Sequence, residues 1–264
     1  MKAARTRAAR TKAAVKRAPA KRGAKPAAPG PSKPAPRWRD VAAVSRAIVA
    51  CEQCARLRTY CAAIAREKRR AYRDETYWGR PVPSFGDPAA RLVIVGLAPG
   101  AHGANRTGRM FTGDSSGDWL YEALHRSGFA ALPTSVARDD GQRLTDCFIT
   151  AAGHCAPPDN KPLPEELERC RPFLEAELGL LTRMRVVLVL GRIGHETYLR
   201  ATGLWDALTP SARPAFAHGA EAVLPSGIVL LSSFHPSRQN TQTGRLTRPM
   251  WHAIFERARE LVER

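Results

Sequence analysis

The chain has 264 residues, of which 44% are hydrophobic, and a formal net charge of +18. This length accommodates one substantial domain, or one domain with a tail, and the charge indicates a polyanionic partner. No segment reaches the roughly 18 to 20 continuous apolar residues of a membrane span, and no apolar signal-peptide segment follows the basic start. The composition therefore excludes an integral membrane protein, and we expect a soluble, intracellular one.

The charge is concentrated at the N-terminus. Residues 1–39 hold 13 of the 42 Lys and Arg and none of the Asp and Glu, among many Ala and Pro. Such a segment buries too little apolar surface to fold, so a disordered basic tail is predicted over 1–39, with the folded domain over 40–264. Its cations suit a nucleic-acid backbone. A solubilising leader and an organelle transit peptide are the alternatives, and the many Lys and Pro argue against the second.

The folded part begins with helical spacing of apolar residues over 41–72, which predicts one or two helices with a CxxC pair near their junction. The Pro- and Gly-rich segment 77–88 predicts an ordered loop. Apolar runs then predict strands at 92–95, 147–150, 186–190 and 228–231. Helix-like stretches lie at about 117–128, 164–183, 192–201 and 248–262. This alternation predicts an α/β fold, a three-layer α/β/α domain around a four-stranded parallel sheet.

A polar segment follows each predicted strand. The segment after the first strand is rich in glycine, which lets the backbone approach a ligand closely. Because the carboxyl ends of parallel strands meet at one edge of the sheet, Asn105, Phe111, His235 and Asn240 are expected to converge in one cleft. A glycine loop also makes ordinary strand-to-helix turns, so this segment alone leaves both interpretations open.

The six cysteines are too few for a disulfide scaffold in a chain of this size. Cys51 and Cys54 form the CxxC pair, whereas Cys155 and Cys170 are too far apart in sequence for the second pair of a zinc ribbon. An iron–sulfur cluster held by four thiolates tolerates such distant ligands. The remaining pair, Cys61 and Cys147, is predicted to be buried, and burial of all six as free thiols is the alternative.

Three long motifs, together with the four cysteines, resemble the family 5 (type B) iron–sulfur uracil-DNA glycosylases. They read GLAPGAHGANRTGRMFTGDSSG at 96–117, CAPPDNKP at 155–162 and HPSRQNTQTGRLT at 235–247. The resemblance implies a monofunctional DNA glycosylase of base excision repair, which hydrolyses the N-glycosidic bond of uracil on a four-stranded α/β/α fold. It also implies a structural 4Fe-4S cluster. By resemblance its ligands are Cys51, Cys54, Cys155 and Cys170.

The resemblance also implies roles in the cleft. Phe111 resembles the aromatic residue that stacks on the flipped base, and His235 the histidine that donates a hydrogen bond to the departing base anion. Asn240 is expected to hold the sugar or order the site. Ala98 and Gly100 belong to the backbone wall that closes on the nucleotide.

Two departures from the better-known uracil-DNA glycosylases bear on mechanism and specificity. Their water-positioning Asp is replaced here by Ala98, and the family implies a compensating group later in the loop, which points to Asn105 or else to Asp114. After the second strand, Ala151 and Ala152 stand where related enzymes place an Asn that reads uracil. A relaxed pocket that also accepts hypoxanthine is therefore predicted.

The last motif supplies the expected DNA contacts. Ser237, Arg238 and Arg245 suit phosphates, and Leu246 is predicted to fill the gap that the flipped base leaves, with Arg245 as the alternative. Burial of Leu246 under the last helix is a competing interpretation. We expect a monomer of the bacterial cytosol or nucleoid that acts on damaged double- or single-stranded DNA. A catalytically weak iron–sulfur nucleic-acid-binding module and an electron carrier are the other candidate functions.

Overall fold

The computed structural model describes residues 38–264, and the predicted tail over 1–39 falls almost wholly outside them. Its disorder and the domain boundary stay predictions. The helices are α1 (Val41–Val49), α2 (Ala55–Glu67), α3 (Ala104–Thr107), α4 (Ser115–Arg126), α5 (Pro164–Leu180), α6 (Arg192–Ala201), α7 (Leu204–Ala207), α8 (Arg238–Gln242) and α9 (Arg248–Glu263), with 3₁₀ turns at Arg70–Tyr72 and Pro158–Asn160. None of these helices combines the length and the hydropathy that a bilayer span requires.

The sheet has six strands in the order β1-β3-β2-β4-β6-β5. They are β1 (Phe85–Gly86), β2 (Leu92–Gly96), β3 (Cys147–Ala151), β4 (Val186–Leu190), β5 (Glu221–Val223) and β6 (Val229–Ser233). The four central strands are parallel and lie where the apolar runs predicted them. The prediction of a four-stranded sheet is wrong at both edges, where β1 and β5 add short antiparallel strands. Strands of two and three residues are too short to show a periodic pattern.

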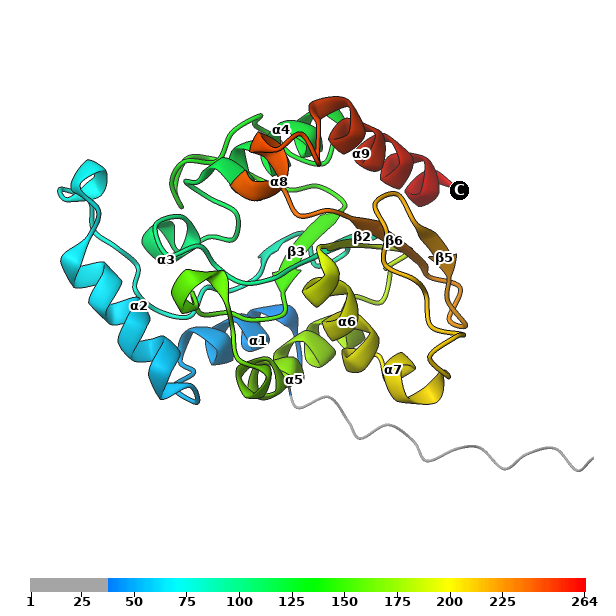
Figure 1. The fold of residues 1–264 in the computed structure, drawn as a ribbon, viewed down its shortest axis with the longest axis horizontal. Coiled ribbons are helices and arrows are strands. Elements are labelled where there is room, and N and C mark those ends of the chain that lie inside the picture. The colour runs from blue at the N-terminus through cyan, green and yellow to red at the C-terminus, as the bar shows by residue number, and fades with distance from the viewer. Residues whose placement is uncertain (1–37) are drawn as a thin grey trace, which may run out of the picture. The chain divides into compact units, whose positions relative to one another are not determined.

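Both faces of the central sheet are covered by helices, which explains why its strands are apolar without alternation. Leu92 and Ile94 pack in the same core as residues of α4 and α9, whereas Val93 and Val95 pack with residues of α5 and α6. Figure 1 shows α4 and α9 above the sheet and α1, α5 and α6 below it. The predicted three-layer arrangement is confirmed.

The strand order places a topological switch point at the end of β2. This strand lies between β3 and β4, so the chain connects β2 to a neighbour on one side and later crosses to the other. Open α/β sheets bind ligands in the crevice that such a reversal leaves at the carboxyl edge. The glycine-rich loop after β2 begins at this point.

The predicted helical region at the start of the domain forms two helices with the CxxC pair between them. The Asp40 carboxylate caps α1 by accepting a hydrogen bond from the Ala43 amide. Val44 and Ile48 of α1 pack against Phe173 of α5, so the junction is held beside the outer face of α5. This packing brings Cys51 and Cys54 to the side of the sheet where Cys170 lies.

Candidate active site and cysteine cavity

The loops after β2 and β6 bring two aromatic rings together. The rings of Phe111 and His235 are stacked, with centroids 5.9 Å apart and planes inclined by 30°. Phe111 has a φ of +51°, a left-handed conformation that is strained for a bulky residue and that is often found at functional sites. Its ring lies against Gly96, where a Cβ would approach it to 2.9 Å. Glycine at the end of β2 therefore makes room for the ring.

His235 is a neutral imidazole at physiological pH. Burial lowers its pKa to about 4, although part of its surface reaches solvent. Neither ring nitrogen has a hydrogen-bond partner among residues 38–264. A neutral imidazole with a free N–H is a ready hydrogen-bond donor to an oxygen that gains negative charge.

The loop that carries His235 is fixed from both sides. The Asn240 amide donates a hydrogen bond of 2.8 Å to the His235 carbonyl oxygen, and the Ser116 hydroxyl donates one of 3.1 Å to the Pro236 carbonyl oxygen. Ser116 belongs to the first turn of α4, so the segments after β2 and β6 are joined directly. The side chain of Asn240 thus faces its own loop, behind His235.

Asp114 lies at the start of α4, beside the glycine-rich loop. Its Oδ1 accepts hydrogen bonds from the amides of Ser116 and Gly117, both 3.0 Å long, and so caps the helix. Its Oδ2 faces the turn at Gly100 and Gly103, where a Cβ on Gly103 would overlap with it. Burial raises the pKa of the Asp114 carboxyl, while the two amide bonds oppose that shift. One carboxylate oxygen remains directed at the loop.

Asn105 lies deeper than the sequence analysis expected. It is 0% exposed and belongs to α3. Its Nδ2 donates hydrogen bonds of 3.4 Å to the carbonyl oxygens of Cys61 and Ala101, and its buried Oδ1 has no hydrogen-bond partner in the described part of the chain. Its amide therefore joins the loop after β2 to α2.

We use the name base pocket for the four residues Phe111, Asp114, His235 and Asn240, which the sequence predicted to share one cleft that receives a base. Of the other residues expected there, Gly100 borders Asp114, but Ala98 lines a neighbouring cavity. The backbone amides of Ala152 and Gly153 donate hydrogen bonds to the carbonyl oxygens of Gly96 and Leu97. The loops after β2 and β3 are thereby paired beyond the end of the sheet, and this pairing joins the base pocket to that cavity.

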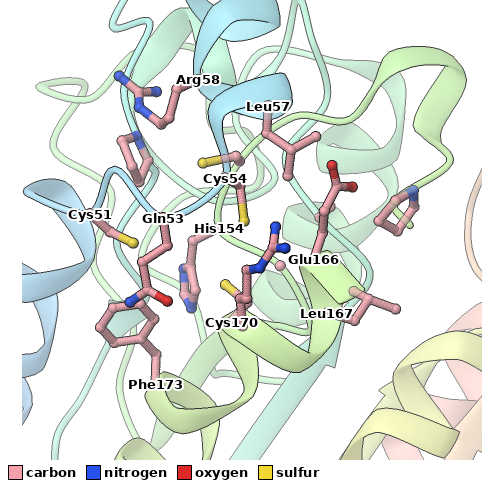
Figure 2. Close-up of a pocket in the computed structure, with 16 residues that line it drawn as sticks. Cys51, Gln53, Cys54, Leu57, Arg58, His154, Glu166, Leu167, Cys170 and Phe173 are labelled. Atoms are coloured by element: carbon pink, nitrogen blue, oxygen red, sulfur yellow. The ribbon is translucent and has the colours of Figure 1, made fainter. Parts of the chain in front are cut away.

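The neighbouring cavity, which we call the cysteine cavity, is lined by all four cysteines that were assigned to a cluster. They come from the α1–α2 junction, from the loop after β3 and from α5, and they are Cys51, Cys54, Cys155 and Cys170. Figure 2 shows Cys51, Cys54 and Cys170 around His154. His154 is 2% exposed, its Nδ1 is 2.8 Å from the Val82 carbonyl oxygen, and its buried Nε2 has no hydrogen-bond partner within residues 38–264.

The lining of the cavity is compatible with an iron–sulfur cluster. Within the described residues no three His, Cys, Asp or Glu side chains lie close enough to share one ion. A four-iron cluster spreads its cysteines over different irons, so its ligands stand farther apart. Arg58 and Arg169 line the cavity, and the Arg169 charge opposes the burial that raises the pKa of Cys54. These cations suit an anionic cluster with thiolate ligands.

Burial disfavours the charged thiolate form of two of these cysteines when no metal is bound. Burial raises the pKa of Cys54, and it raises the pKa of Cys170 to about 12. A metal ion reverses such shifts because it binds the deprotonated sulfur. The donor set is therefore one that a metal cluster would stabilise.

The two remaining cysteines are buried, as predicted. Cys147 lies within β3 at 0% exposure. Cys61 of α2 is equally buried, and its Sγ donates a hydrogen bond of 3.5 Å to the Ala156 carbonyl oxygen. The neighbouring Cys155 thiol lowers the pKa of Cys61, and Cys61 in turn raises the pKa of Cys155. This contact of Cys61 with the loop after β3 was not predicted.

Among the expected DNA contacts, the structure corrects one. Leu246 is 0% exposed and packs in the core with residues of α9, so the prediction that it fills the duplex is wrong for this conformation. Arg245 is exposed, and its guanidinium lies 4.6 Å from the centroid of the Phe234 ring. Ser237 caps α8 through its side chain, and Arg238 is exposed at the start of that helix. The alternative, Arg245, is the residue that reaches the surface.

One group near Phe111 in sequence was not predicted to have a role in the site. Arg109 is 4% exposed and forms an ion pair of 2.6 Å with Asp140 and a hydrogen bond of 2.6 Å with the Ser135 hydroxyl. The Gly113 amide donates to the Ser135 carbonyl oxygen. These contacts fasten the segment around Phe111 to the long connection before β3. No local motif marks partners that lie this far apart in sequence.

Comparisons with known proteins agree with this arrangement. The profile of the Uracil DNA glycosylase superfamily matches residues 83–259. A type-5 uracil-DNA glycosylase of Thermus thermophilus is 51% identical over 223 residues, which cover 84% of this chain and 99% of that protein. The type-5 uracil-DNA glycosylase of Mycobacterium bovis is 46% identical over 223 residues, 84% of this chain and 82% of that protein. That of Pyrobaculum aerophilum is 43% identical over 211 residues, 80% of this chain and 88% of that protein.

Proposed function

The chain belongs to the type-5 uracil-DNA glycosylases of the uracil-DNA glycosylase superfamily, and from that premise we propose how it excises uracil and which other bases it accepts. It is a glycosylase of base excision repair. The observation that carries the mechanism is the stacked pair of Phe111 and His235 at the switch point of the sheet. A flipped base would stack on Phe111 and place its edge beside the free N–H of His235.

His235 acts on the leaving group. Cleavage of the bond to deoxyribose leaves negative charge on the base, and a preorganised donor stabilises that charge most strongly where water is excluded. Burial keeps the imidazole neutral, so its N–H donates without protonating the base fully. Asn240 is a positioning residue, because its amide holds the carbonyl of the residue that donates.

Asp114 is the group that we propose orients the attacking water. Asn105 shared this role in the sequence analysis, but its side chain is fully buried and tied to α2. Asp114 keeps Oδ2 directed at the turn of Gly100, which the substrate is expected to approach. A carboxylate there would also stabilise the positive charge that develops on the sugar.

The pocket is proposed to accept hypoxanthine as well as uracil. Ala151 and Ala152 are both buried at the end of β3, and neither offers a side-chain amide that could read the edge of uracil. A site that hydrogen-bonds its substrate rejects an analogue because the analogue leaves a buried polar group unpaired. Without the Asn amide, a base other than uracil does not incur that cost here. Selectivity would then rest on shape and stacking.

The cysteine cavity is proposed to hold a 4Fe-4S cluster on Cys51, Cys54, Cys155 and Cys170. When bound, the cluster would cross-link the α1–α2 junction, the loop after β3 and α5. Ala98 lines the same cavity, so the wall of the base pocket would depend on that cross-link. Iron and sulfide content and the visible absorbance of protein purified without oxygen test this assignment.

DNA is the proposed partner, contacted by Ser237, Arg238 and Arg245, with the basic residues 1–39 as an additional non-specific anchor. Arg245, rather than Leu246, would occupy the space left by the flipped base. A monomer in the bacterial cytosol or nucleoid remains our expectation. Deletion of residues 1–36 should weaken binding to undamaged DNA at low salt and leave excision from short duplexes nearly unchanged.

The proposed activity is tested with duplex oligonucleotides that carry uracil or hypoxanthine opposite a defined base, followed by alkali to cleave abasic sites. Cluster-replete protein should release both bases. Excision of uracil with no detectable excision of hypoxanthine would refute the relaxed pocket. An absence of strand breaks with either substrate would instead favour a binding module without catalysis.

Two variants separate the water-orienting candidates. Asp114→Asn keeps an oxygen that can cap α4, so it should fold normally while excision falls roughly 100- to 10,000-fold. Asn105→Ala should lower the melting temperature more than it lowers the rate, because it breaks the bond to α2. If Asn105→Ala instead lowered the rate strongly and Asp114→Asn did not, Asn105 would be the residue that orients the water.

A further inference from the structure

Arg106 is a buried cation that has no part in the mechanism described so far. It lies on α3 and is 7% exposed. Its Nη1 forms an ion pair with Glu75, and its guanidinium carbon lies 4.0 Å from the centroid of the Tyr72 ring. Both partners belong to the segment that follows α2, so the guanidinium is anchored to that segment.

The other donors of Arg106 connect the two backbone segments that border the Asp114 carboxylate. Nε donates a hydrogen bond of 2.8 Å to the His102 carbonyl oxygen, and Nη2 donates one of 2.8 Å to the Gly113 carbonyl oxygen. Gly103, which follows His102, is so close to Asp114 Oδ2 that a Cβ would lie 1.9 Å from it. Gly113 directly precedes Asp114. One guanidinium therefore ties both segments together.

Gly113 allows this close approach. Its φ is +78°, a conformation that glycine adopts without strain, and a Cβ there would lie 2.3 Å from Arg106 Nη2. A larger residue at this position would therefore push the guanidinium away from the carbonyl oxygen that it binds.

The charge of Arg106 also acts on Asp114. Burial raises the pKa of the Asp114 carboxyl, and so does the negative charge of Asp118 in the first turn of α4. The amides of Gly117 and Ser116 and the positive charge of Arg106 oppose these effects. Of the two charged side chains, only Arg106 favours the ionised form of Asp114.

We propose that Arg106 is a positioning residue for base excision, which holds the Asp114 carboxylate at the turn of Gly100 and Gly103. The inference rests on the proposed role of Asp114 in orienting water. Arg106 acts through Asp114, because it fixes the backbone on both sides of the carboxylate and keeps the carboxylate charged. A protonated Asp114 would not stabilise the positive charge that develops on the sugar.

Arginine suits both roles better than lysine does. Its planar guanidinium directs donors at several acceptors at once, here the carbonyl oxygens of His102 and Gly113 and the carboxylate of Glu75. A lysine would keep the charge, but its single nitrogen does not reproduce this fork of donors.

Two variants separate the roles of geometry and charge in single-turnover release of uracil, measured from about pH 5 to 9. Arg106→Gln removes the charge, so the acidic limb of its pH profile should move to higher pH, and its rate at about pH 8 should fall roughly 10- to 100-fold. Arg106→Lys should keep the limb at its wild-type position but lose roughly tenfold in rate, because the fork of donors is lost.

DNA binding provides a readout that a general loss of structure would change. Binding to a duplex with a 2′-fluorinated deoxyuridine, which resists cleavage, should stay within about twofold of wild type in both variants, because Asp114 acts during cleavage. Glu75→Gln is the matched control. It breaks another contact of the same guanidinium but leaves the charge, so its acidic limb should not move to higher pH.

Three outcomes would overturn the inference: an acidic limb at the wild-type position in Arg106→Gln, a full rate in Arg106→Lys, or a loss of DNA binding equal to the loss of rate. If melting temperatures show that Arg106→Gln does not fold, the rate of Arg106→Lys decides. Asp114→Asn in the same assay tests the proposed function separately, and a wild-type rate there would refute the role of Asp114. Loss of rate in Asp114→Asn, with wild-type profiles in both Arg106 variants, would refute only the role of Arg106.

Discussion

The base pocket and the cysteine cavity adjoin the same end of the sheet, yet they are held in place differently. In the base pocket, hydrogen bonds within the chain fix His235 through Asn240, cap α4 through Asp114 and anchor the segment around Phe111 through Arg109. In the cysteine cavity, burial raises the pKa of Cys54 and Cys170, and the Nε2 of His154 is unpartnered in the described chain. The first site is held by hydrogen bonds within the chain, whereas the second leaves buried polar atoms that the proposed cluster would satisfy.

Substitutions in the two sites should therefore have different effects: those in the base pocket should lower the rate of excision, and those in the cysteine cavity should lower stability. Loss of a group in the base pocket removes chemistry and leaves the surrounding hydrogen bonds in place. Loss of a cysteine leaves three thiols and a buried histidine around a space that no side chain fills. The pairing between the loops after β2 and β3 then carries the disturbance from the cavity to the pocket.

The largest expected effect follows removal of a proposed cluster ligand. Cys170→Ala should abolish the visible absorbance and destabilise the protein by more than about 4 kcal/mol, a size typical of losing a metal site. Excision should fall with stability, because Ala98 lines the cavity. Thermal unfolding and iron content measure this, with Cys147→Ala as the control that keeps both. Unchanged stability in Cys170→Ala would show that the cavity is self-supporting.

His235→Ala should produce the opposite pattern. Excision of uracil should fall roughly 100- to 1000-fold, the usual cost of removing one donor to a developing anion. Melting temperature and iron content should stay at the wild-type values, because neither ring nitrogen bonds the protein within the described residues. With the pKa near 4, the imidazole stays neutral and the wild-type rate should show no His235 titration between about pH 6 and 8. A step near pH 6.5 would contradict the assignment.

Glu177 extends the comparison to a buried carboxyl. It is buried on α5, accepts a 2.6 Å hydrogen bond from the Thr150 hydroxyl and has no ion-pair partner in the described region. Burial raises its pKa from 4.5 to about 7. Between these values the folded state binds more protons than the unfolded state, so stability falls as pH rises.

Glu177→Gln should remove that slope. Relative to this variant, wild-type protein should lose on the order of 3 kcal/mol between about pH 4.5 and 7, where the two pKa values bound the window. Chemical denaturation at several pH values measures it. Asp140, which is paired with Arg109, provides the contrast: Asp140→Asn should destabilise the protein at neutral pH. Parallel pH profiles for wild-type and Glu177→Gln protein would contradict the shift.

Much of the fold followed from local patterns. The continuous apolar runs of β2, β3, β4 and β6 marked a buried parallel sheet, and the loops at their ends identified the cleft. The edge strands β1 and β5 could not be predicted from the sequence, because two or three residues are too few to show a periodic pattern. The role of Leu246 was predicted wrongly because the sequence around an apolar residue in a polar loop is the same whether its side chain points to DNA or to the core.

The candidate site was predictable in its members but not in their orientation. Asn105 and Asp114 lie nine positions apart in one loop, and only the three-dimensional arrangement places one side chain against α2 and the other against Gly103. The hydrogen bond from the Cys61 sulfur to the Ala156 carbonyl oxygen likewise joins distant segments. Pairings of this kind depend on tertiary packing, which local spacing does not encode.

The smallest expected effect tests how closely the base pocket is fixed. Asn240→Asp keeps the shape of the side chain but replaces its donor by a second acceptor, so the hydrogen bond to the His235 carbonyl is lost. A neutral hydrogen bond of this kind contributes about 1 kcal/mol, and excision should fall by roughly five- to tenfold while the cluster stays intact. The loss should appear in the rate of base release rather than in DNA binding, because His235 would be displaced from a charge that exists only during cleavage. Equal weakening of DNA binding would instead place Asn240 against the sugar, which is the other of the two roles that the sequence suggested.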